Sequence, residues 1–463
     1  MLHASTPKPA SPNLILTATS LGFILIILDV TVVNVALERI KASLDTDISG
    51  LQWVVNAYTL VFASLLLTAG ALGDRLGAKR VFLAGFALFT TASLACGLAD
   101  HIALLVAGRA VPGVRAAPCV PASLALLNAS FPEPAARARA VSIWAGAGGF
   151  ALAAGPVMGG IMVDRLGWPS IFFLNLPFGA VGLWLTWLYA PQGSRTPDRG
   201  LDLVGQVLAI LALGGLTLGF IESGALGRMH PLVLAGFGSF AVGAVAFLLT
   251  EARSADPMLP LSLFRSSAVR TSCIVGLLTN FAYYGPMFVL SLFFQAAKGY
   301  SPLATGLAFL PMTALVTVAS LVAGWLTARF GPRLPMAIGQ AVAAAGYIAL
   351  SGINAATPYG IIVGPLLAAG IGVALTVPSM TAAVLANTDK RRAGTASGAL
   401  NAARQTGGVI GVGAFGSLVS GESTSLVGGM HVSLIIANLA MVVGCLVSAI
   451  GLRYRTAQAV GES

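Results

Sequence analysis

The stretch NLILTATSLGFILIILDVTVVNVAL (residues 13–37) decides the fold class, because it is long and apolar enough to cross a lipid bilayer. A transmembrane helix needs about 20 predominantly apolar residues. This stretch contains one acidic residue, Asp29, within its apolar run. A carboxylate inside a membrane is costly unless it faces a partner or an aqueous cavity. The stretch therefore predicts a membrane helix and an acid that needs a partner.

The composition of the whole chain agrees with this reading. The chain has 463 residues, of which 57% are hydrophobic and 9% are charged, and its mean hydropathy is +0.88. Soluble domains carry about 25% charged residues. The net charge of +10 comes without a Lys/Arg run interleaved with aromatics. We therefore predict an integral membrane protein whose partners are the lipid bilayer and small molecules, with no nucleic acid.

Apolar segments of spanning length recur along the whole chain, which predicts an all-α polytopic membrane protein with fourteen transmembrane helices. The segment 393–420 has the weakest apolar signal, because Arg404 and many glycines dilute it. The predicted helices are 13–37, 51–73, 80–98, 102–127, 137–163, 168–190, 203–221, 231–250, 268–295, 303–328, 334–354, 357–386, 393–420 and 431–453.

Lysine and arginine are distributed unequally between the loops on the two sides of these helices. Most of them, including Arg75, Lys79, Arg80 and Arg333, fall on the side that also holds both ends of the chain. Cytoplasmic loops of membrane proteins carry an excess of Lys and Arg. We therefore predict a multi-pass protein of the cytoplasmic (inner) membrane with both termini in the cytoplasm.

The sequence also contains an internal repeat. GALGDRLGAKR (70–80) follows the second helix and GWLTARFGPRL (324–334) follows the tenth, so that Gly70, Arg75 and Gly77 match Gly324, Arg329 and Gly331. The repeat predicts two six-helix bundles with two inserted helices, and transporters often place their substrate path between such repeats. The predicted organisation is a cytoplasmic tail (1–12), an N-terminal bundle (13–190), a linker region with the inserted helices (191–267), a C-terminal bundle (268–454) and a second tail (455–463).

Asp29 has one predicted partner at its own depth. It lies about 12 Å from the outer end of its helix near Leu37, and Arg109 lies about as far from the outer start of the fourth helix, at 1.5 Å per residue. Two readings remain open. The pair is either purely structural, or Asp29 gains and loses a proton as access to it changes.

Several motifs together resemble the major facilitator superfamily, in particular its fourteen-helix drug:proton antiporter family. The first are LDVTVVNVAL (28–37) and GALGDRLGAKR (70–80). Others are QWVVNAYTL (52–60), AAGPVMGG (153–160), GWPSIFFLNLPFG (167–179), GYSPLATGLAFLPM (299–312) and RRAGTASGALNAARQTGG (391–408). The resemblance covers nearly the whole chain.

The resemblance implies roles for particular residues. Asp29 would be the proton-coupling acid, with Arg109 as its associated arginine. The gating loops would comprise Gly70, Asp74, Arg75, Gly77, Lys79 and Arg80, with Arg329, Gly331 and Arg333 in the second repeat. The antiporter motif would comprise Gly155, Pro156, Gly159 and Gly160. For the loops, anchoring of positive charge at the cytoplasmic surface is the alternative; for the motif, an ordinary packing kink is.

The chain departs from the family pattern at two places. In RAVPGVR (109–115), Pro112 replaces the usual glutamine and Arg115 replaces a glycine, which puts the usual partners of Arg109 in doubt. Arg115 would favour neutral or anionic over cationic drugs. In the second repeat, Ala328 stands where the first has Asp74, so the two gates are not equivalent.

Polar and aromatic residues within the predicted spans are candidates for the substrate cavity, although helix packing explains such residues equally well. They are Trp53, Asn56, Tyr58, Arg115, Asn280, Tyr284, Phe288, Arg404 and Gln405. Glu222, near the outer end of the seventh helix, is either a secondary acid or a loop residue, and the loop position is expected.

These patterns favour a secondary transporter over other classes. The chain has no GxxxxGK[ST] or HExxH motif, and its scattered histidines and cysteines have no metal-ligand spacing. We expect no enzyme, no metal and no cofactor, with the proton gradient as energy source, and a monomer. The main hypothesis is proton-coupled antiport that exports drug-like or antibiotic molecules. The alternatives are a proton-coupled metabolite importer, and an uncoupled facilitator, channel or sensor.

Overall fold

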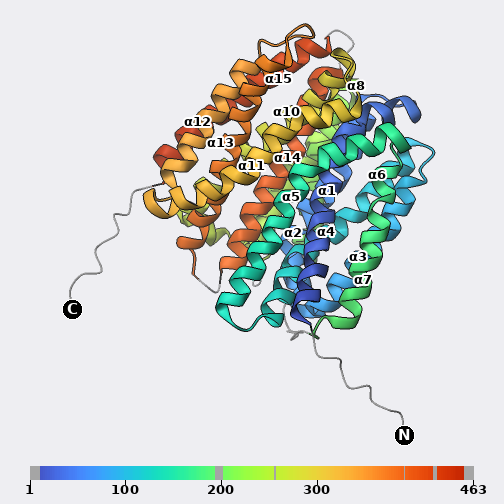
Figure 1. Ribbon diagram of the computed structural model, residues 1–463. Helices are drawn as coiled ribbons and strands as arrows, with labels where there is room; N and C mark the ends of the chain where they lie inside the picture. Colours follow the sequence, from blue (N-terminus) through green and yellow to red (C-terminus); the bar gives the residue numbers. More distant parts are fainter. Residues whose placement is uncertain (1–10, 193–201, 255–256, 390–391, 421–424, 453–463) are drawn as a thin grey trace.

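The structure is a computed structural model that describes residues 11–192, 202–254, 257–389, 392–420 and 425–452, without the side chains of residues 67, 69–71, 73, 74 and 115. All regular secondary structure in these residues is helical (Figure 1). The helices are α1 (Pro12–Ser43), α2 (Ile48–Leu76), α3 (Ala78–Gly97), α4 (Ile102–Ser130), α5 (Pro134–Leu166), α6 (Ser170–Phe173), α7 (Asn175–Tyr189), α8 (Leu203–Ala225), α9 (Pro231–Arg253), η1 (Leu261–Arg265), α10 (Ser267–Leu292), η2 (Phe293–Ala297), α11 (Pro302–Phe330), α12 (Arg333–Leu350), α13 (Tyr359–Ala386), α14 (Ala393–Ser420) and α15 (Leu426–Gly451).

Among the described residues, 13 helical stretches are long and apolar enough to cross a membrane. The short α6 and the following α7 together form one of them, Ser170–Tyr189. The long helix of the described residues that falls outside this set is α14, which has 28 residues but carries Arg404 and many glycines. Because α14 packs along α10 and α2 like its neighbours, it completes the fourteen helices that the sequence predicts.

The packing of α1–α7 is repeated by α10–α15. In the first group α1 packs against α5 and α7, α2 against α4, and α3 against α4 and α7. In the second group α10 packs against α14 and α15, α11 against α13, and α12 against α13 and α15. In Figure 1 the blue-to-green group and the orange-to-red group lie side by side. The duplicated packing confirms the internal repeat.

Equivalent glycines end the second helix of each group. Gly77 follows α2 with a φ of 90°, and Gly331 follows α11 with a φ of 74°. Residues with a side chain rarely adopt this part of conformational space, whereas glycine enters it at little cost. The matched glycines therefore make the same sharp turn into α3 and α12.

The helices α8 and α9 stand outside this repeat. They pack closely against each other, and α8 also packs against α2 and α14. Gly215 and Gly236 allow this pairing, since a Cβ atom on Gly215 would lie 2.6 Å from the Gly236 carbonyl oxygen. In the candidate span of α9 only 17% of residues are buried, so most of its surface is left for lipid. The inserted pair thus covers the seam between α2 and α14.

The two groups meet along two symmetric seams, where α5 packs on α11 and α2 packs on α14. We call the side at which α1 begins the near side and the side at which α1 ends the far side. In the described part of the chain, the hydrogen bonds between α1–α7 and α10–α15 lie at the middle of the helices or towards the far side. Among the described side chains, the hydrogen bonds that join the two groups therefore lie from the middle of the helices to the far side.

Candidate functional site

An ion pair lies inside the first group of helices. The Nη1 atom of Arg109, on α4, donates to the Oδ2 atom of Asp29, on α1, over 2.5 Å, and both side chains are 2% exposed. Their matching depths in the sequence predict this contact. A buried ion pair needs further hydrogen bonds to offset its desolvation. The Arg109 Nε atom supplies one, because it donates to the backbone oxygen of Val54 on α2 over 3.1 Å.

Aromatic rings complete the surroundings of Arg109. Its guanidinium carbon lies 5.0 Å from the ring centre of Tyr58 and 5.9 Å from that of Phe172. Gly113 allows α2 to come this close to α4, since a Cβ atom there would lie 2.6 Å from the Tyr58 backbone oxygen. Cations are attracted to the faces of aromatic rings. Arg109 therefore links Asp29 to α2 and α6 as well as to its own helix.

The glycines of the predicted antiporter motif bring α5 into contact with both groups. A Cβ atom on Gly155 would collide with the Thr31 hydroxyl of α1, and one on Gly159 would lie 2.9 Å from Val35. Gly160 faces α11 instead, where a Cβ atom would lie 2.6 Å from the Cα atom of Leu303. Small residues permit such close approaches between membrane helices. This motif therefore connects the helix that carries Asp29 to the other group.

On α11, Gly306 makes the reciprocal contact, because a Cβ atom there would collide with the backbone oxygen of Pro156. Pro156 itself is buried within α5. About two turns along α5 from Pro156 towards the near side, the Gly149 backbone oxygen accepts a hydrogen bond from the Thr317 hydroxyl over 3.1 Å. The seam between α5 and α11 is thus a run of backbone-level contacts.

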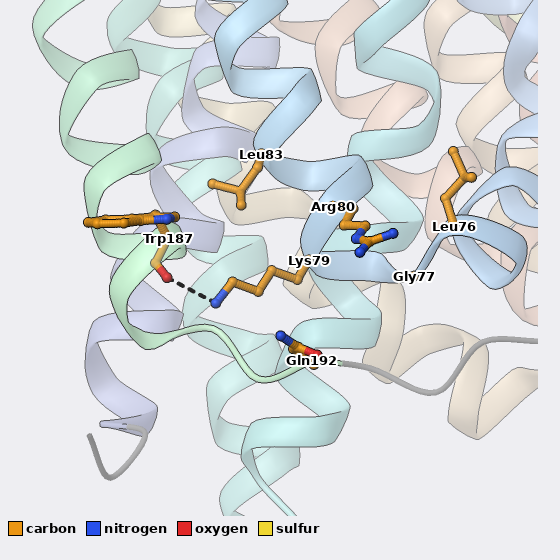
Figure 2. Close-up of a pocket in the computed structure, with 7 residues that line it drawn as sticks. All are labelled: Leu76, Gly77, Lys79, Arg80, Leu83, Trp187 and Gln192. Atoms are coloured by element: carbon orange, nitrogen blue, oxygen red, sulfur yellow. Dashed lines mark hydrogen bonds between the residues drawn. The ribbon is translucent and has the colours of Figure 1, made fainter. Parts of the chain in front are cut away.

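The first predicted gating loop is tied to its own group of helices. The Lys79 Nζ atom donates to the backbone oxygens of Trp187 and Ala190, over 2.9 and 2.8 Å, at the end of α7. Figure 2 shows Lys79 reaching across a small surface pocket that Arg80 and Gln192 also line. A cation satisfies the free carbonyl groups at the end of a helix. Lys79 thus joins α3 to α7 rather than one group to the other.

The other predicted gating residues occupy the near-side surface. Arg75 and Arg80 are exposed. The guanidinium carbon of Arg329 lies 5.5 Å from the ring centre of Trp325 on its own helix, and Arg333 begins α12. Gly70 and Asp74 both belong to α2, and the Asp74 side chain lies outside the described residues. For the described members of the two loops, the structure contains no ion pair.

Three candidates for the substrate cavity lie on α2. Asn56 is fully buried and its Nδ2 atom donates to the Val409 backbone oxygen of α14 over 3.4 Å. The Trp53 Nε1 atom donates to the Glu222 carboxylate of α8 over 2.8 Å. Tyr58 is buried beside Arg109. In this conformation these side chains join helices, and Trp53 is the one that is partly exposed.

The candidates in the second group are divided between core and partly exposed positions. On α10, Asn280 and Phe288 are buried, and Tyr284 is partly exposed. On α14, Arg404 and Gln405 are partly exposed, and the Tyr284 ring packs over Gly408, one turn further along. The Tyr284 ring therefore meets α14 one helical turn from Arg404. The side chain of Arg115 lies outside the described residues.

The structure adds residues of the far-side closure that the sequence patterns do not predict. The Gln52 Nε2 atom donates to the backbone oxygens of Val412 and Gly413 over 3.0 and 2.8 Å. The Ser291 hydroxyl donates to the Asn34 backbone oxygen over 2.6 Å. A backbone acceptor leaves no mark on residue type, so the polar Gln52 within an apolar helix is the one signal that the sequence contains.

Two acids also belong to this far-side region. The Asp164 carboxylate at the end of α5 accepts from the Leu303 backbone N–H at the start of α11 over 3.0 Å, which is favourable at a helix N-terminus. Glu222 accepts the Trp53 bond from within α8, so its expected loop position was wrong. The helix continues past its apolar run because its last turn is held against α2.

The chain is similar in sequence to known membrane transport and resistance proteins. A sequence profile described as Major Facilitator Superfamily matches residues 19–412. The methylenomycin A resistance protein of Streptomyces coelicolor is 39% identical over 408 residues, which cover 88% of this chain and 86% of that protein. The cephamycin export protein CmcT of Amycolatopsis lactamdurans is 34% identical, with 91% of this chain and 87% of that protein covered.

Solved structures share the fold at low sequence identity. A POT family transporter in complex with 5-aminolevulinic acid superimposes with a TM-score of 0.73 at 14% identity, covering 96% of this chain and 97% of that one. A bacterial homologue of the human lysosomal transporter Spinster superimposes with a TM-score of 0.67 at 15% identity, covering 95% and 96%. At these identities the likeness concerns the fold alone.

Proposed function

The chain belongs to the major facilitator superfamily, and on that premise we propose that it exports drug-like or antibiotic small molecules in exchange for protons. Relatives named for methylenomycin A resistance and for cephamycin export support the substrate class. The observation that carries the coupling is the buried pair of Asp29 and Arg109. An ionisable group inside a membrane protein commonly marks an ion pathway.

The contacts of Asp29 give protonation a structural consequence. Arginine stays charged in proteins, so a proton that enters the pair neutralises Asp29 and removes the charge that attracts Arg109. Arg109 keeps its bond to Val54 and its aromatic neighbours, whereas α1 loses its strongest polar tie to α4. Two residues along α1, Thr31 rests on Gly155 of α5. A change in how α1 packs therefore reaches the seam between α5 and α11.

Alternating access requires that the proton and the substrate prefer different states of the two groups. We propose that the near side faces the cytoplasm, because the Lys- and Arg-rich loops lie there. With the far side closed, the described state would then accept substrate from the cytoplasm. Opening of the far side would break the bonds that Gln52 and Asp164 make to the second group.

The test uses purified protein in liposomes with an imposed pH gradient and a pH-sensitive dye inside. We would add cationic, neutral and anionic antibiotics to the wild type, to Asp29→Asn and to Asp100→Asn. Asp100 is a matched control because it is an exposed loop carboxylate paired with His101. We expect some compounds to move protons through the wild type and Asp100→Asn, and none to do so through Asp29→Asn.

Each other outcome has a defined meaning. Proton movement through Asp29→Asn at the wild-type rate would reject Asp29 as the coupling acid. Substrate flux down its own gradient without proton movement would leave a facilitator. Uptake driven by the proton gradient, in the direction of proton entry, would make the protein an importer.

A further inference from the structure

The helix α14 carries a second membrane arginine, Arg404, in an environment unlike that of Arg109. It lies about 16 Å along the helix from Ala393, at 1.5 Å per residue, well inside the membrane. Its side-chain stem is pressed against α10, since a Cβ atom on Gly276 would lie 2.9 Å from the Arg404 Cγ atom. The packing of the stem fixes where the guanidinium group is held.

The charge of Arg404 is not balanced within the described part of the chain. Its Nη1 atom donates to the Asn401 amide oxygen over 3.2 Å, and its Nε atom is buried without a hydrogen-bond partner. None of the described carboxylates lies within ion-pair distance of it. A buried donor without a partner is costly, and a buried charge without a counter-charge costs more. Within the described residues, Arg404 therefore lacks a counter-charge and a hydrogen-bond acceptor for its Nε atom.

The surroundings of Arg404 are open towards the near side. Asn401 is exposed and Arg404 and Gln405 are partly exposed, whereas Gly407 and Gly408 of the next turn are buried. Among the side chains of α2 that the structure describes, those that bond to α14 reach Val409, Val412 and Gly413, on the far side of Arg404. Exposure thus increases along α14 from Gly408 towards Asn401.

We propose that Arg404 anchors an anionic group, foremost a carboxylate, of the molecule that the protein exports. This inference rests on the proposed export function and narrows its substrate class. A guanidinium group presents parallel N–H donors that match the two oxygens of a carboxylate, and such charge-assisted bonds are about twice as strong as neutral ones. The exposed amide of Asn401 lies beside it, and the Tyr284 ring packs over Gly408, one turn further along the same helix.

The position of Arg404 in the second group suits an exchange with protons. Asp29 lies in the first group, so the carboxylate of a substrate at Arg404 and the proton at Asp29 would occupy different groups. An anchored anion supplies the counter-charge that Arg404 lacks, and its release on the far side would leave Arg404 unpaired again. Arg404 is more stable when paired with a substrate anion than when unpaired, and this gain in free energy makes binding selective for anions.

The test compares compounds that differ only in this charge. Cefoxitin, benzylpenicillin and nalidixic acid each carry one carboxylate, and the methyl ester of each removes it. Binding to the full-length protein would be measured by calorimetry in dodecyl maltoside, a detergent without charge, so that no lipid phosphate competes. The variants are Arg404→Gln and Arg404→Lys, with Arg392→Gln as a control that removes an exposed charge at the start of the same helix.

We expect the wild type and Arg392→Gln to bind at least one acid about tenfold or more tighter than its ester. Arg404→Gln should lose this preference by weakening the acid about 10- to 100-fold while the ester changes less than about twofold. Arg404→Lys should recover part of it, because lysine keeps the charge but not the planar fork. A misfolded Arg404→Gln protein would lose binding of the acid and of the ester alike. In that case the preference of Arg404→Lys for the acid over the ester would test the proposal.

The results that overturn the proposal differ from those that overturn export. If the wild type exports compounds in liposomes but binds every ester as well as its acid, the anion site is wrong and export stands. Equal preference for the acid in the wild type and in Arg404→Gln would likewise reject the anion site and leave export standing. If no compound of any charge is exported, the proposed function fails, and the anion site fails with it.

Discussion

Arg109 and Arg404 are both membrane arginines, one in each group of helices, and they differ in what surrounds them. Arg109 is 2% exposed and has a carboxylate, a backbone oxygen and two aromatic rings as neighbours. Arg404 is partly exposed and has one amide oxygen. The duplicated fold thus carries a closed charge site in one half and an open one in the other.

This difference indicates that the two halves have different functions, one in proton binding and the other in substrate binding. When a cation is paired with a carboxylate, protonation of the carboxylate weakens the pair. Such a pair therefore suits a proton site. A cation without a partner gains most from a ligand that brings one, which suits a substrate site. Mutations should therefore affect the two halves differently, with stability most sensitive around Arg109 and selectivity most sensitive around Arg404.

The largest expected effect is the loss of Arg109. Arg109→Met leaves the buried Asp29 carboxylate without its partner, which should lower the free energy of unfolding by about 3–5 kcal/mol. The double variant Asp29→Asn with Arg109→Met removes both charges and should recover most of that loss. Denaturant unfolding in detergent measures both. Equal stability of the single variant and the wild type would show that the pair is not a closed charge site.

A smaller loss in the free energy of unfolding is expected at the seam where α5 packs on α11. Gly160→Ala places a Cβ atom 2.6 Å from the Leu303 Cα atom and 2.7 Å from the Pro302 oxygen, and backbone atoms there cannot turn aside. Overpacking of this kind costs about 1–3 kcal/mol, and it should also slow transport.

The matched control for this seam lies on the same helix. A Cβ atom on Gly146 meets nothing within 4 Å, so Gly146→Ala should leave stability and transport near those of the wild type. Thermal unfolding and liposome efflux of the two variants measure the contrast. Similar behaviour of both would remove the α5–α11 contact from the transport mechanism.

A loss of about 1 kcal/mol in the free energy of unfolding is expected when the bond between α2 and the inserted helix α8 is removed. Trp53→Phe removes the bond to Glu222 that ties α2 to α8 but keeps an aromatic ring of similar shape. Trp184→Phe is the control, because Trp184 is 57% exposed on the outside of α7. Cysteine crosslinking across the far side should fall for Trp53→Phe and stay unchanged for Trp184→Phe. Unchanged crosslinking in both would show that α8 does not hold the far side closed.

The smallest expected effect on stability is at Arg404. Arg404→Leu removes a charge that has no counter-charge in the described residues, so the free energy of unfolding should stay the same or rise by about 1 kcal/mol. The same denaturant series that measures Arg109→Met applies here. A loss as large as that of Arg109→Met would indicate a structural partner for Arg404 and would remove the contrast between the halves.

The sequence predicts those features that depend on one helix at a time or on repetition. Depth along antiparallel helices pairs Asp29 with Arg109 because both are charges that the bilayer would otherwise penalise. The matched loops predict the duplication, and the structure confirms it down to the turn glycines, Gly77 and Gly331. Composition predicts the spans, although α14 is not among the 13 described helices that are apolar enough by hydropathy and charge.

Features that depend on which helix faces which could not be predicted in this way. Gln52 and Ser291 bind backbone oxygens across the two groups, and a backbone oxygen is present at every position. α1 runs on to Ser43, past the apolar stretch that ends near Leu37, because Ile40 is fully buried and extends the packed face of the helix by a turn. The polar neighbours of Arg404 likewise depend on how α10 meets α14.

The most direct test of the central claim measures protons released by the protein itself. A compound identified by the liposome assay would be added to unbuffered protein in detergent with a pH indicator, for the wild type, Asp29→Asn and Asp100→Asn. If Asp29 is the site that exchanges its proton for substrate, the wild type and Asp100→Asn release protons on binding and Asp29→Asn binds without releasing any. Equal release from Asp29→Asn and the wild type would contradict the role of the Asp29–Arg109 pair in coupling.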